Sequence, residues 1–131
     1  MKLQPDRSDA QAITGYGPGW VGINGERVTH SVLVGSAGQR RPWGCERFED
    51  LGPEHFAQLA EFDCELVIFG SGAKNRFPRP AWLQPLMQRR IGLETMDTAA
   101  ACRTYNILAQ EGRNVVAALL LEAPPAGPVP A

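Results

Sequence analysis

The chain has 131 residues, of which 44% are hydrophobic and 21% are charged, and its formal net charge is −1. This length and composition are typical of one globular domain with a single core, and no apolar run approaches the ~20 residues of a membrane span. A net charge so close to zero gives no overall attraction for nucleic acid or for an anionic membrane, so we expect no nucleic acid partner.

The N-terminal part of the chain predicts a flexible start and then a β-hairpin. Residues 1–12 are polar, and we expect them to be flexible. Asn24-Gly25 is a strong hairpin signal, because both central positions of a type I′ turn need a positive φ. We therefore predict a hairpin in which residues 20–23 pair with residues 26–34.

The middle of the chain contains its clearest buried strand. Residues 45–50 leave room for a short strand, and Pro53 opens a helix that ends by Asp63. Leu66–Phe69 is a run of four apolar residues, which is typical of a strand covered on both faces. This strand runs directly into the turn Gly70-Ser71-Gly72, whose glycines allow a sharp bend or a close approach.

The second half of the chain alternates helices and strands. A second helix is predicted for residues 80–90, with Pro85 either bending it or delaying its start. Leu93–Met96 is a short strand, and Asp97 is a good N-cap for a third helix that runs to about Glu111. We expect this helix to bury one stripe of small and apolar side chains, namely Ala100, Ala101, Thr104, Ile107 and Leu108.

An apolar strand at residues 114–121 completes the pattern. The order strand, helix, strand, helix, strand implies an α/β sheet whose strands are covered. We therefore predict a single three-layer α/β domain over residues 13–121, with a mixed central sheet and an N-terminal β-hairpin. The proline-rich tail, residues 122–131, is expected to be disordered.

The cysteines and the N-terminal residues indicate the cellular compartment in which we expect the protein. The three cysteines show no CxxC spacing, which argues against a disulfide scaffold and a zinc cluster, and we expect no cofactor. A reducing compartment is then the default. The N-terminus lacks the apolar core of a secretory signal, and Asp6 and Asp9 suit a mitochondrial presequence poorly, so we expect a cytoplasmic protein.

The turn Gly70-Ser71-Gly72 resembles the start of a dinucleotide-binding fingerprint, but the rest of that pattern is missing. Asn75 occupies the third glycine position, and a loop with two prolines follows where a helix should begin. The nucleophile pattern G-x-S-x-G is also absent around Ser71. We therefore expect no catalytic residue at this turn.

The same turn is nevertheless a candidate wall of a cleft. The Gly70–Gly72 turn and Asp97 each follow a strand. If these strands are parallel neighbours, both turns lie at the sheet edge where ligands gather in α/β folds. Lys74, Arg76 and Arg103 would then give the cleft a positive rim.

Cys102 allows two interpretations. It lies in the first half of the third predicted helix, beside Arg103. Helix N-termini and cations both lower the pKa of a thiol, so a reactive thiol is one interpretation. A buried structural cysteine is the other, and the sequence leaves both open.

Two stretches together resemble a known family. They are Leu66–Gly72 with Arg76-Phe77-Pro78, and the run Gly92–Asn106, which contains Met-Asp-Thr and Thr-Tyr-Asn. In this combination they are similar to the family of the mitochondrial complex I (NADH dehydrogenase) assembly factor three, which also includes bacterial proteins of unknown function. The resemblance covers residues 13–121.

The resemblance implies a compact three-layer α/β fold, no established enzyme activity, and binding of protein partners during assembly of a respiratory complex. It marks, without a catalytic role, Gly70, Gly72, Asp97, Thr98, Thr104, Tyr105 and Asn106. Together with the cleft, the candidate site comprises Gly70, Ser71, Gly72, Arg76, Asp97, Thr98, Cys102, Arg103, Tyr105 and Asn106. The lack of a presequence favours a bacterial member of the family.

The leading hypothesis is a non-enzymatic protein-interaction domain that assists assembly of a respiratory or membrane complex. It is motivated by the resemblance and by the lack of a catalytic constellation in the sequence. The alternative is a small-molecule-binding domain, or an uncharacterised enzyme, that uses a cleft near Gly72 and Asp97. The sequence leaves open which protein is the partner and whether the chain forms a homo-oligomer.

Overall fold

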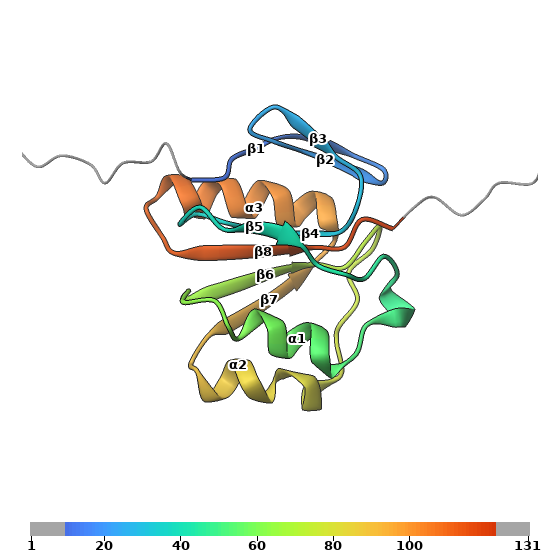
Figure 1. Cartoon of the computed structure of the whole chain (residues 1–131), viewed down its shortest axis with the longest axis vertical. Coiled ribbons are helices and arrows are strands. Elements are labelled where there is room, and N and C mark those ends of the chain that lie inside the picture. Colours follow the sequence, from blue (N-terminus) through green and yellow to red (C-terminus); the bar gives the residue numbers. More distant parts are fainter. Residues whose placement is uncertain (1–9, 123–131) are drawn as a thin grey trace, which may run out of the picture.

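Figure 1 shows a computed structural model of the chain, which describes residues 10–122. Within these residues the chain forms a small antiparallel sheet and a mixed central sheet. The strands of the small sheet, in spatial order, are β1 (Ile13–Gly17), β2 (Trp20–Ile23) and β3 (Glu26–Val28). Those of the central sheet are β5 (Arg40–Pro42), β4 (Val32–Gly35), β8 (Val115–Leu119), β6 (Leu66–Gly70) and β7 (Gly92–Met96). The helices are α1 (Pro53–Leu59), α2 (Gln84–Gln88) and α3 (Thr98–Gln110), with short 3₁₀ turns η2 (Phe48–Asp50) and η3 (Pro80–Leu83).

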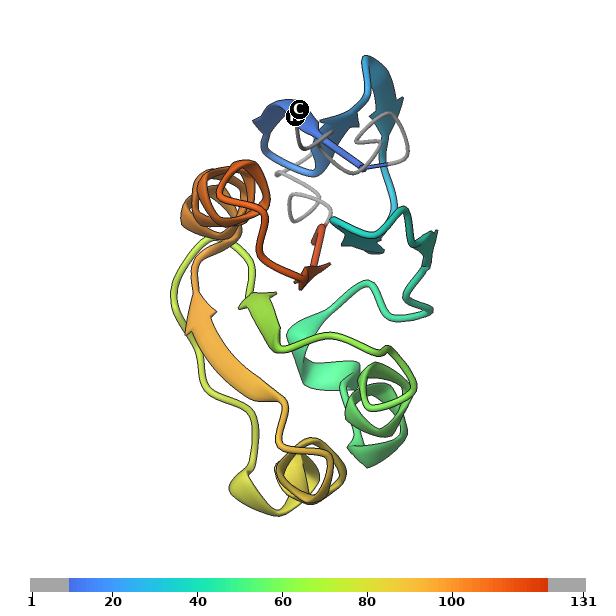
Figure 2. The same ribbon diagram turned by 90° about the vertical axis from the view of Figure 1, so that its left-hand side faces the viewer.

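The central sheet is covered on both faces (Figure 2). α3 and the small sheet lie side by side on one face, and α1 and α2 lie on the other. Leu66 and Ile68 of β6 belong to the core on the α3 side, whereas Val67 and Phe69 belong to the core on the α1 side. The predicted three-layer α/β fold with a mixed central sheet is therefore confirmed.

The strands β7, β6 and β8 run parallel and end at the same edge of the central sheet. Gly70, the last residue of β6, is in register with Met96 of β7 and with Leu119 of β8. β4 pairs with β8 in the antiparallel direction. The segments that follow β6, β7 and β8 therefore leave the sheet together, at the edge where α/β folds bind ligands.

The N-terminal hairpin is present, but its predicted second strand is too long. The turn residues Asn24 and Gly25 have φ values of 52° and 85°, as a type I′ turn requires. The returning strand ends at Val28, and the chain then crosses to the central sheet as β4. The crossing contains the buried Ser31, whose hydroxyl accepts a hydrogen bond from the backbone N of Leu121. β3 and β4 are both apolar on their buried side. The apolar pattern alone therefore does not reveal that the chain passes from one sheet to the other between them.

Two local predictions in the middle of the chain have different outcomes. No strand forms within residues 45–50, where the chain makes η2; the strand lies earlier, because residues 40–42 pair with β4. The second helix does start late, as Pro85 suggested. α2 begins at Gln84, and Pro85 occupies its first turn, where a missing N–H costs no hydrogen bond.

The buried face of α3 differs from the predicted stripe. The fully buried residues of this helix are Ala101, Cys102 and Tyr105, whereas Ile107 is 57% exposed. The central sheet contacts the helix on one side and β1 contacts it on another. The predicted stripe assumed that α3 packs against one surface only. Because two surfaces cover the helix, its buried side chains lie on a face that is rotated from the predicted one.

The predicted flexible ends lie mostly outside the described residues, which exclude 1–9 and 123–131. At the boundaries, Ala12 donates a backbone hydrogen bond to the Asn24 side chain, and the half-buried Glu122 forms an ion pair with Arg76. Contacts with the folded domain therefore extend to Gln11, whose carbonyl O accepts a hydrogen bond from Tyr105, and to Glu122, and both residues lie outside the predicted range 13–121. Within residues 10–122, no helix is long and apolar enough to cross a membrane.

Gly70 allows α3 to lie against β6, and we expect this contact to be sensitive to one added methyl group. A Cβ at position 70 would lie 2.9 Å from the Cα of Thr98 and 3.0 Å from the Cβ of Ala101. We expect Gly70→Ala to lower the free energy of unfolding by about 1–3 kcal/mol, measured by urea denaturation. The control is Gly92→Ala on β7, where the added Cβ meets the flexible end of Leu66 at 3.2 Å. Equal losses in the two variants would contradict this account.

Candidate functional site

A pocket of about 490 Å³ opens at the edge where β6, β7 and β8 end. Its walls come from the segments that follow these three strands and from the turn between β1 and β2. We call it the edge pocket. Its lining residues are Tyr16, Gly17, Pro18, Gly19, Gly72, Ala73, Asp97, Thr98, Ala99, Leu120, Leu121 and Glu122.

The edge pocket contains three of the residues that the sequence placed in a candidate cleft. Gly72 and Asp97 both line it, together with Thr98. Because β6 and β7 are parallel neighbours, the turn after β6 and the cap after β7 meet at one edge. The geometry is as predicted, whereas a role of these residues in binding stays a prediction.

The polar side chains at the start of α3 are engaged within the fold. The carboxylate of Asp97 accepts a hydrogen bond from the backbone N of Ala100 at 2.8 Å, as an N-cap does. The hydroxyl of Thr98 accepts from the backbone N of Gly72 at 2.8 Å and donates to the carbonyl O of Leu120 at 2.9 Å. Thr98 therefore ties the segment after β6 to the end of β8.

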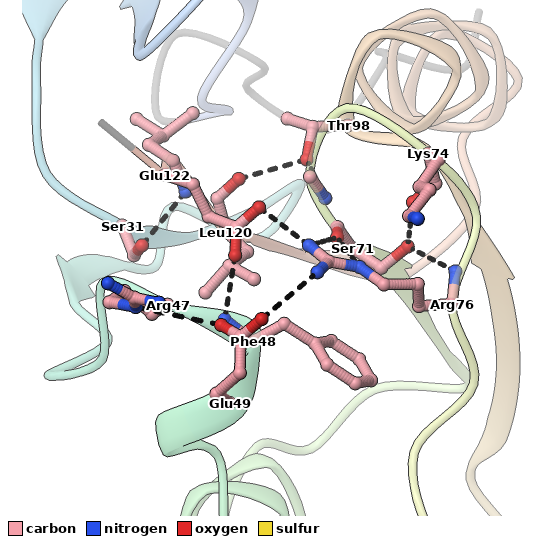
Figure 3. Close-up of polar contacts among 12 residues, drawn as sticks. Ser31, Arg47, Phe48, Glu49, Ser71, Lys74, Arg76, Thr98, Leu120 and Glu122 are labelled. Atoms are coloured by element: carbon pink, nitrogen blue, oxygen red, sulfur yellow. Dashed lines mark hydrogen bonds and ion pairs between the residues drawn. The ribbon is translucent and has the colours of Figure 1, made fainter. Parts of the chain in front are cut away.

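Arg76 forms an ion pair with Glu122, which is one of the residues that line the pocket (Figure 3). Its Nη2 lies 2.6 Å from Oε1 of Glu122 and also donates to the carbonyl O of Ser71. Oε2 of Glu122 accepts from the backbone N of Phe48, and the guanidinium lies 4.4 Å from the centre of the Phe48 ring. Arg76 therefore holds the loop after β6 against the end of β8, and it does not line the pocket as a positive rim.

Ser71 is fully buried and closes the loop that leaves β6. Its hydroxyl donates to the carbonyl O of Lys74 and accepts from the backbone N of Arg76, both at 2.8 Å. A buried hydroxyl that already donates one hydrogen bond and accepts another is not available to a substrate. The expectation that the turn carries no nucleophile stays a prediction.

Arg103 reaches the rim of the edge pocket through Tyr16. Its Nη1 donates to the phenolic O of Tyr16 at 2.8 Å. Tyr16 is 38% exposed, so the pair presents an aromatic ring and a positive charge side by side at the rim. Lys74 is exposed but does not line the pocket, so the predicted positive rim is reduced to Arg103.

Tyr105 and Asn106 lie further along α3 and hold β1 in place. The side-chain amide of Asn106 donates to the carbonyl O of Ile13 at 2.7 Å and accepts from its backbone N at 3.0 Å. The buried Tyr105 hydroxyl donates to the carbonyl O of Gln11. These two residues do not line the pocket. They position β1, whose following turn forms one of its walls.

Cys102 is fully buried against the central sheet. Burial raises the pKa of its thiol to about 12, and the opposing effect of the nearby Arg103 charge is smaller. A thiol with this pKa is protonated at neutral pH, and a reactive cysteine needs an accessible thiolate. The geometry therefore favours the structural interpretation of Cys102.

The site offers no cluster of metal ligands. Among residues 10–122, no group of three or more histidine, cysteine, aspartate or glutamate side chains is arranged to hold a metal ion. The free cysteines Cys45, Cys64 and Cys102 are all buried.

Residues 13–120 match the family described as "Protein of unknown function (DUF498/DUF598)". The chain belongs to this family. A human relative, NADH dehydrogenase (ubiquinone) 1 alpha subcomplex assembly factor 3, is 34% identical over 134 residues, which cover 95% of this chain and 67% of the relative. An uncharacterised Rhodobacter capsulatus protein is 35% identical over 127 residues, which cover 97% of this chain and 95% of that protein.

Solved structures have the same fold as this chain. The crystal structure of a Bordetella parapertussis protein matches with a TM-score of 0.80 and 35% sequence identity, covering 86% of this chain and 97% of that one. The resemblance to the complex I assembly factor family, seen in the sequence, is thereby confirmed. The human assembly factor is longer, since this chain spans about two thirds of it.

Sequence reasoning missed two walls of the edge pocket. One is the turn of Tyr16–Gly19, and the other is the end of β8 at Leu120–Glu122. The second could have been inferred, because an apolar strand parallel to β6 must end at the same edge. The position of the first depends on contacts between β1 and α3 such as Asn106 with Ile13, which leave no local signal.

The burial of Cys102 predicts slow alkylation in the folded protein. We expect iodoacetamide to modify Cys102 at least about tenfold more slowly than a cysteine in an unstructured peptide, because thiolate and access are both lacking. Mass spectrometry of tryptic peptides measures the rate at this position. Unfolding in guanidinium chloride should restore the ordinary rate, and fast labelling of the native protein would return Cys102 to the reactive interpretation.

The ion pair of Arg76 with Glu122 predicts a measurable contribution to stability. We expect Arg76→Met to lower the free energy of unfolding by about 1–3 kcal/mol, because it leaves a half-buried carboxylate without its partner. Adding Glu122→Gln should recover part of the loss, which a double-mutant cycle measures. The matched control is Arg113→Met, since Arg113 and Glu65 also lie 2.6 Å apart but are more exposed. A larger loss at Arg113 would contradict this ranking.

Proposed function

We propose that this protein is a protein-interaction domain that assists assembly of a respiratory or membrane complex, and that the edge pocket receives an apolar side chain of its partner. The observation that carries the proposal is that the polar side chains around the pocket already form hydrogen bonds or ion pairs within the fold. Asp97 caps α3, Thr98 bonds to two backbone groups, and Glu122 is paired with Arg76. What remains for a partner is largely apolar surface.

The apolar part of the lining comes from several elements. Tyr16 and Pro18 face it from the β1–β2 turn, and Leu120 and Leu121 from the end of β8. Buried pockets for an apolar or aromatic anchor residue provide most of the affinity at many protein interfaces. The pocket is therefore suited to an anchor residue, with the Arg103 charge beside it on the rim.

The assembly role is supported by the relatives. The human relative is named as an assembly factor of NADH dehydrogenase. The Rhodobacter capsulatus relative is matched over nearly its whole length and is uncharacterised. We extend the assembly role to this chain as a proposal, together with a cytoplasmic location in a bacterium. No nucleic acid partner is part of the proposal, and a homo-oligomer is left to experiment.

The alternative is a small-molecule site, or an uncharacterised enzyme, at the same pocket. A volume of about 490 Å³ lies within the range of small-molecule sites. The residues that line it, however, show no pair of nucleophile and base, and the nearby Ser71 hydroxyl is buried and engaged. The apolar lining therefore favours the protein anchor over catalysis.

A bulky substitution inside the pocket tests the proposal. Ala73 lines the pocket and is exposed, so Ala73→Trp should fill the pocket without disturbing the core. We expect the tagged variant to recover at least about fivefold less partner from its native cells than the unaltered protein, because the anchor residue is displaced. Ala57→Trp, on the exposed face of α1 at the other layer, is the matched control.

A photo-crosslinking residue at position 73 identifies the partner. The proposal expects a defined crosslink to a subunit or assembly protein of a respiratory or membrane complex, and none from position 57. A metabolite that stays bound in native mass spectrometry, is lost in Ala73→Trp, and is accompanied by no crosslinked protein would contradict the proposal and support the alternative.

A further inference from the structure

A second groove lies between the open edges of the two sheets, and it shares no lining residue with the edge pocket. Among residues 10–122, β3 is the last strand of the small sheet and β5 is the last strand of the central sheet, so each has one edge that no described strand pairs with. Residues of both strands, and of the link between β3 and β4, line a groove of about 480 Å³. We call it the basic groove.

The basic groove carries an excess of positive charge in a chain that is slightly acidic overall. Arg27, Arg40 and Arg41 line it, and the one carboxylate in its lining belongs to Glu26. Arg40 Nη2 lies 3.0 Å from Oε1 of Glu26, so this carboxylate neutralises one of the three arginines. Arg41 has a longer contact of 3.5 Å with Glu61, and both of these side chains are exposed. The lining therefore retains charge that an acidic partner would neutralise.

The backbone of β5 is oriented to pair with another strand. Next to β5, the backbone N of Trp43 donates to the carbonyl O of Ser31, and that of Gly35 donates to the carbonyl O of Gln39. Hydrogen-bonded and non-hydrogen-bonded pairs alternate along an antiparallel ladder, so the N–H and C=O of Arg40 point away from β4, toward the open edge. Pro42 lies at the next such position and lacks an N–H, as tolerated on an edge strand.

We propose that the basic groove binds an extended, acidic segment of a protein partner, which adds to the open edge of β5. Main-chain hydrogen bonds to the edge give affinity in this mode of recognition, and side chains on alternate positions give specificity. Carboxylates at these positions would meet the arginines of the groove. This surface is separate from the edge pocket, so the inference does not depend on the function proposed for that pocket.

The groove favours a peptide over a nucleic acid strand. Proteins that bind single-stranded nucleic acid stack bases on aromatic rings. No phenylalanine, tyrosine or tryptophan of the described residues lines the groove. A strand edge also offers donors and acceptors at the spacing of a polypeptide backbone, which a phosphate backbone does not match.

The test uses a fluorescein-labelled peptide of alternating glutamate and valine and measures binding to the full chain by fluorescence anisotropy. We expect saturable binding that weakens as salt is added, because exposed charges contribute to it. A peptide with lysine in place of glutamate should not bind. A peptide that is N-methylated on alternate residues should bind at least about tenfold more weakly, because it cannot pair with the strand edge.

Charge-reversing variants locate the binding. Arg40→Glu and Arg27→Glu should each weaken binding by about tenfold or more, because the carboxylates of the peptide then meet like charges. Arg79→Glu makes the same change in net charge at an exposed site outside the groove and should leave binding unchanged. Circular dichroism checks that each variant is folded. If Arg40→Glu unfolds the protein, Arg27→Glu alone tests the inference, because Arg27 is exposed.

Three results of the peptide-binding measurements would overturn the inference. They are no binding of the acidic peptide, equal binding by the folded Arg27→Glu variant, and equal binding of the N-methylated peptide. Competition by a single-stranded oligonucleotide at the same concentration as the peptide would also overturn it in favour of a nucleic acid site. Amide shifts in the nuclear magnetic resonance spectrum should be confined to β3, β5 and the link after β3.

Discussion

The arrangement of the domain depends on how closely α3 lies against the end of β6. Gly70 leaves room for the first turn of the helix, and the Thr98 hydroxyl joins the segment after β6 to the end of β8. The backbone N of Thr98 returns a hydrogen bond to the carbonyl O of Gly72 at 2.8 Å. With this joint in place, three parallel strands end at one edge, and α3 provides the surface on which β1 rests.

The same joint explains the chemical character of the edge pocket. The polar side chains at this edge are of the kind that a catalytic or ligand-binding site presents to its ligand. Here they form hydrogen bonds within the fold instead. Asp97, Thr98 and Glu122 are all used in this way. A surface of this kind is suited to recognition by shape and apolar character, and that is the basis of the proposed function.

Much of the architecture could be predicted from the sequence because its signals are local. The apolar run of β6, the Asp97 cap and the Asn24-Gly25 turn each specify their own conformation, and parallel order then places two turns at one edge. The rest depends on tertiary contacts. The buried face of α3 is set by two covering surfaces, and the division of the N-terminal strands between two sheets is set at the buried Ser31.

The order of strands in the central sheet has a consequence for synthesis. β8 is the last strand that the structure describes, yet it lies between β4 and β6, which are made much earlier. Until residues 115–119 have left the ribosome, β4 has no neighbour on that side and β6 lacks one of its two parallel partners. Such long-range pairing slows folding and leaves strand edges open to other chains. The nascent chain is therefore most exposed to aggregation just before β8 appears.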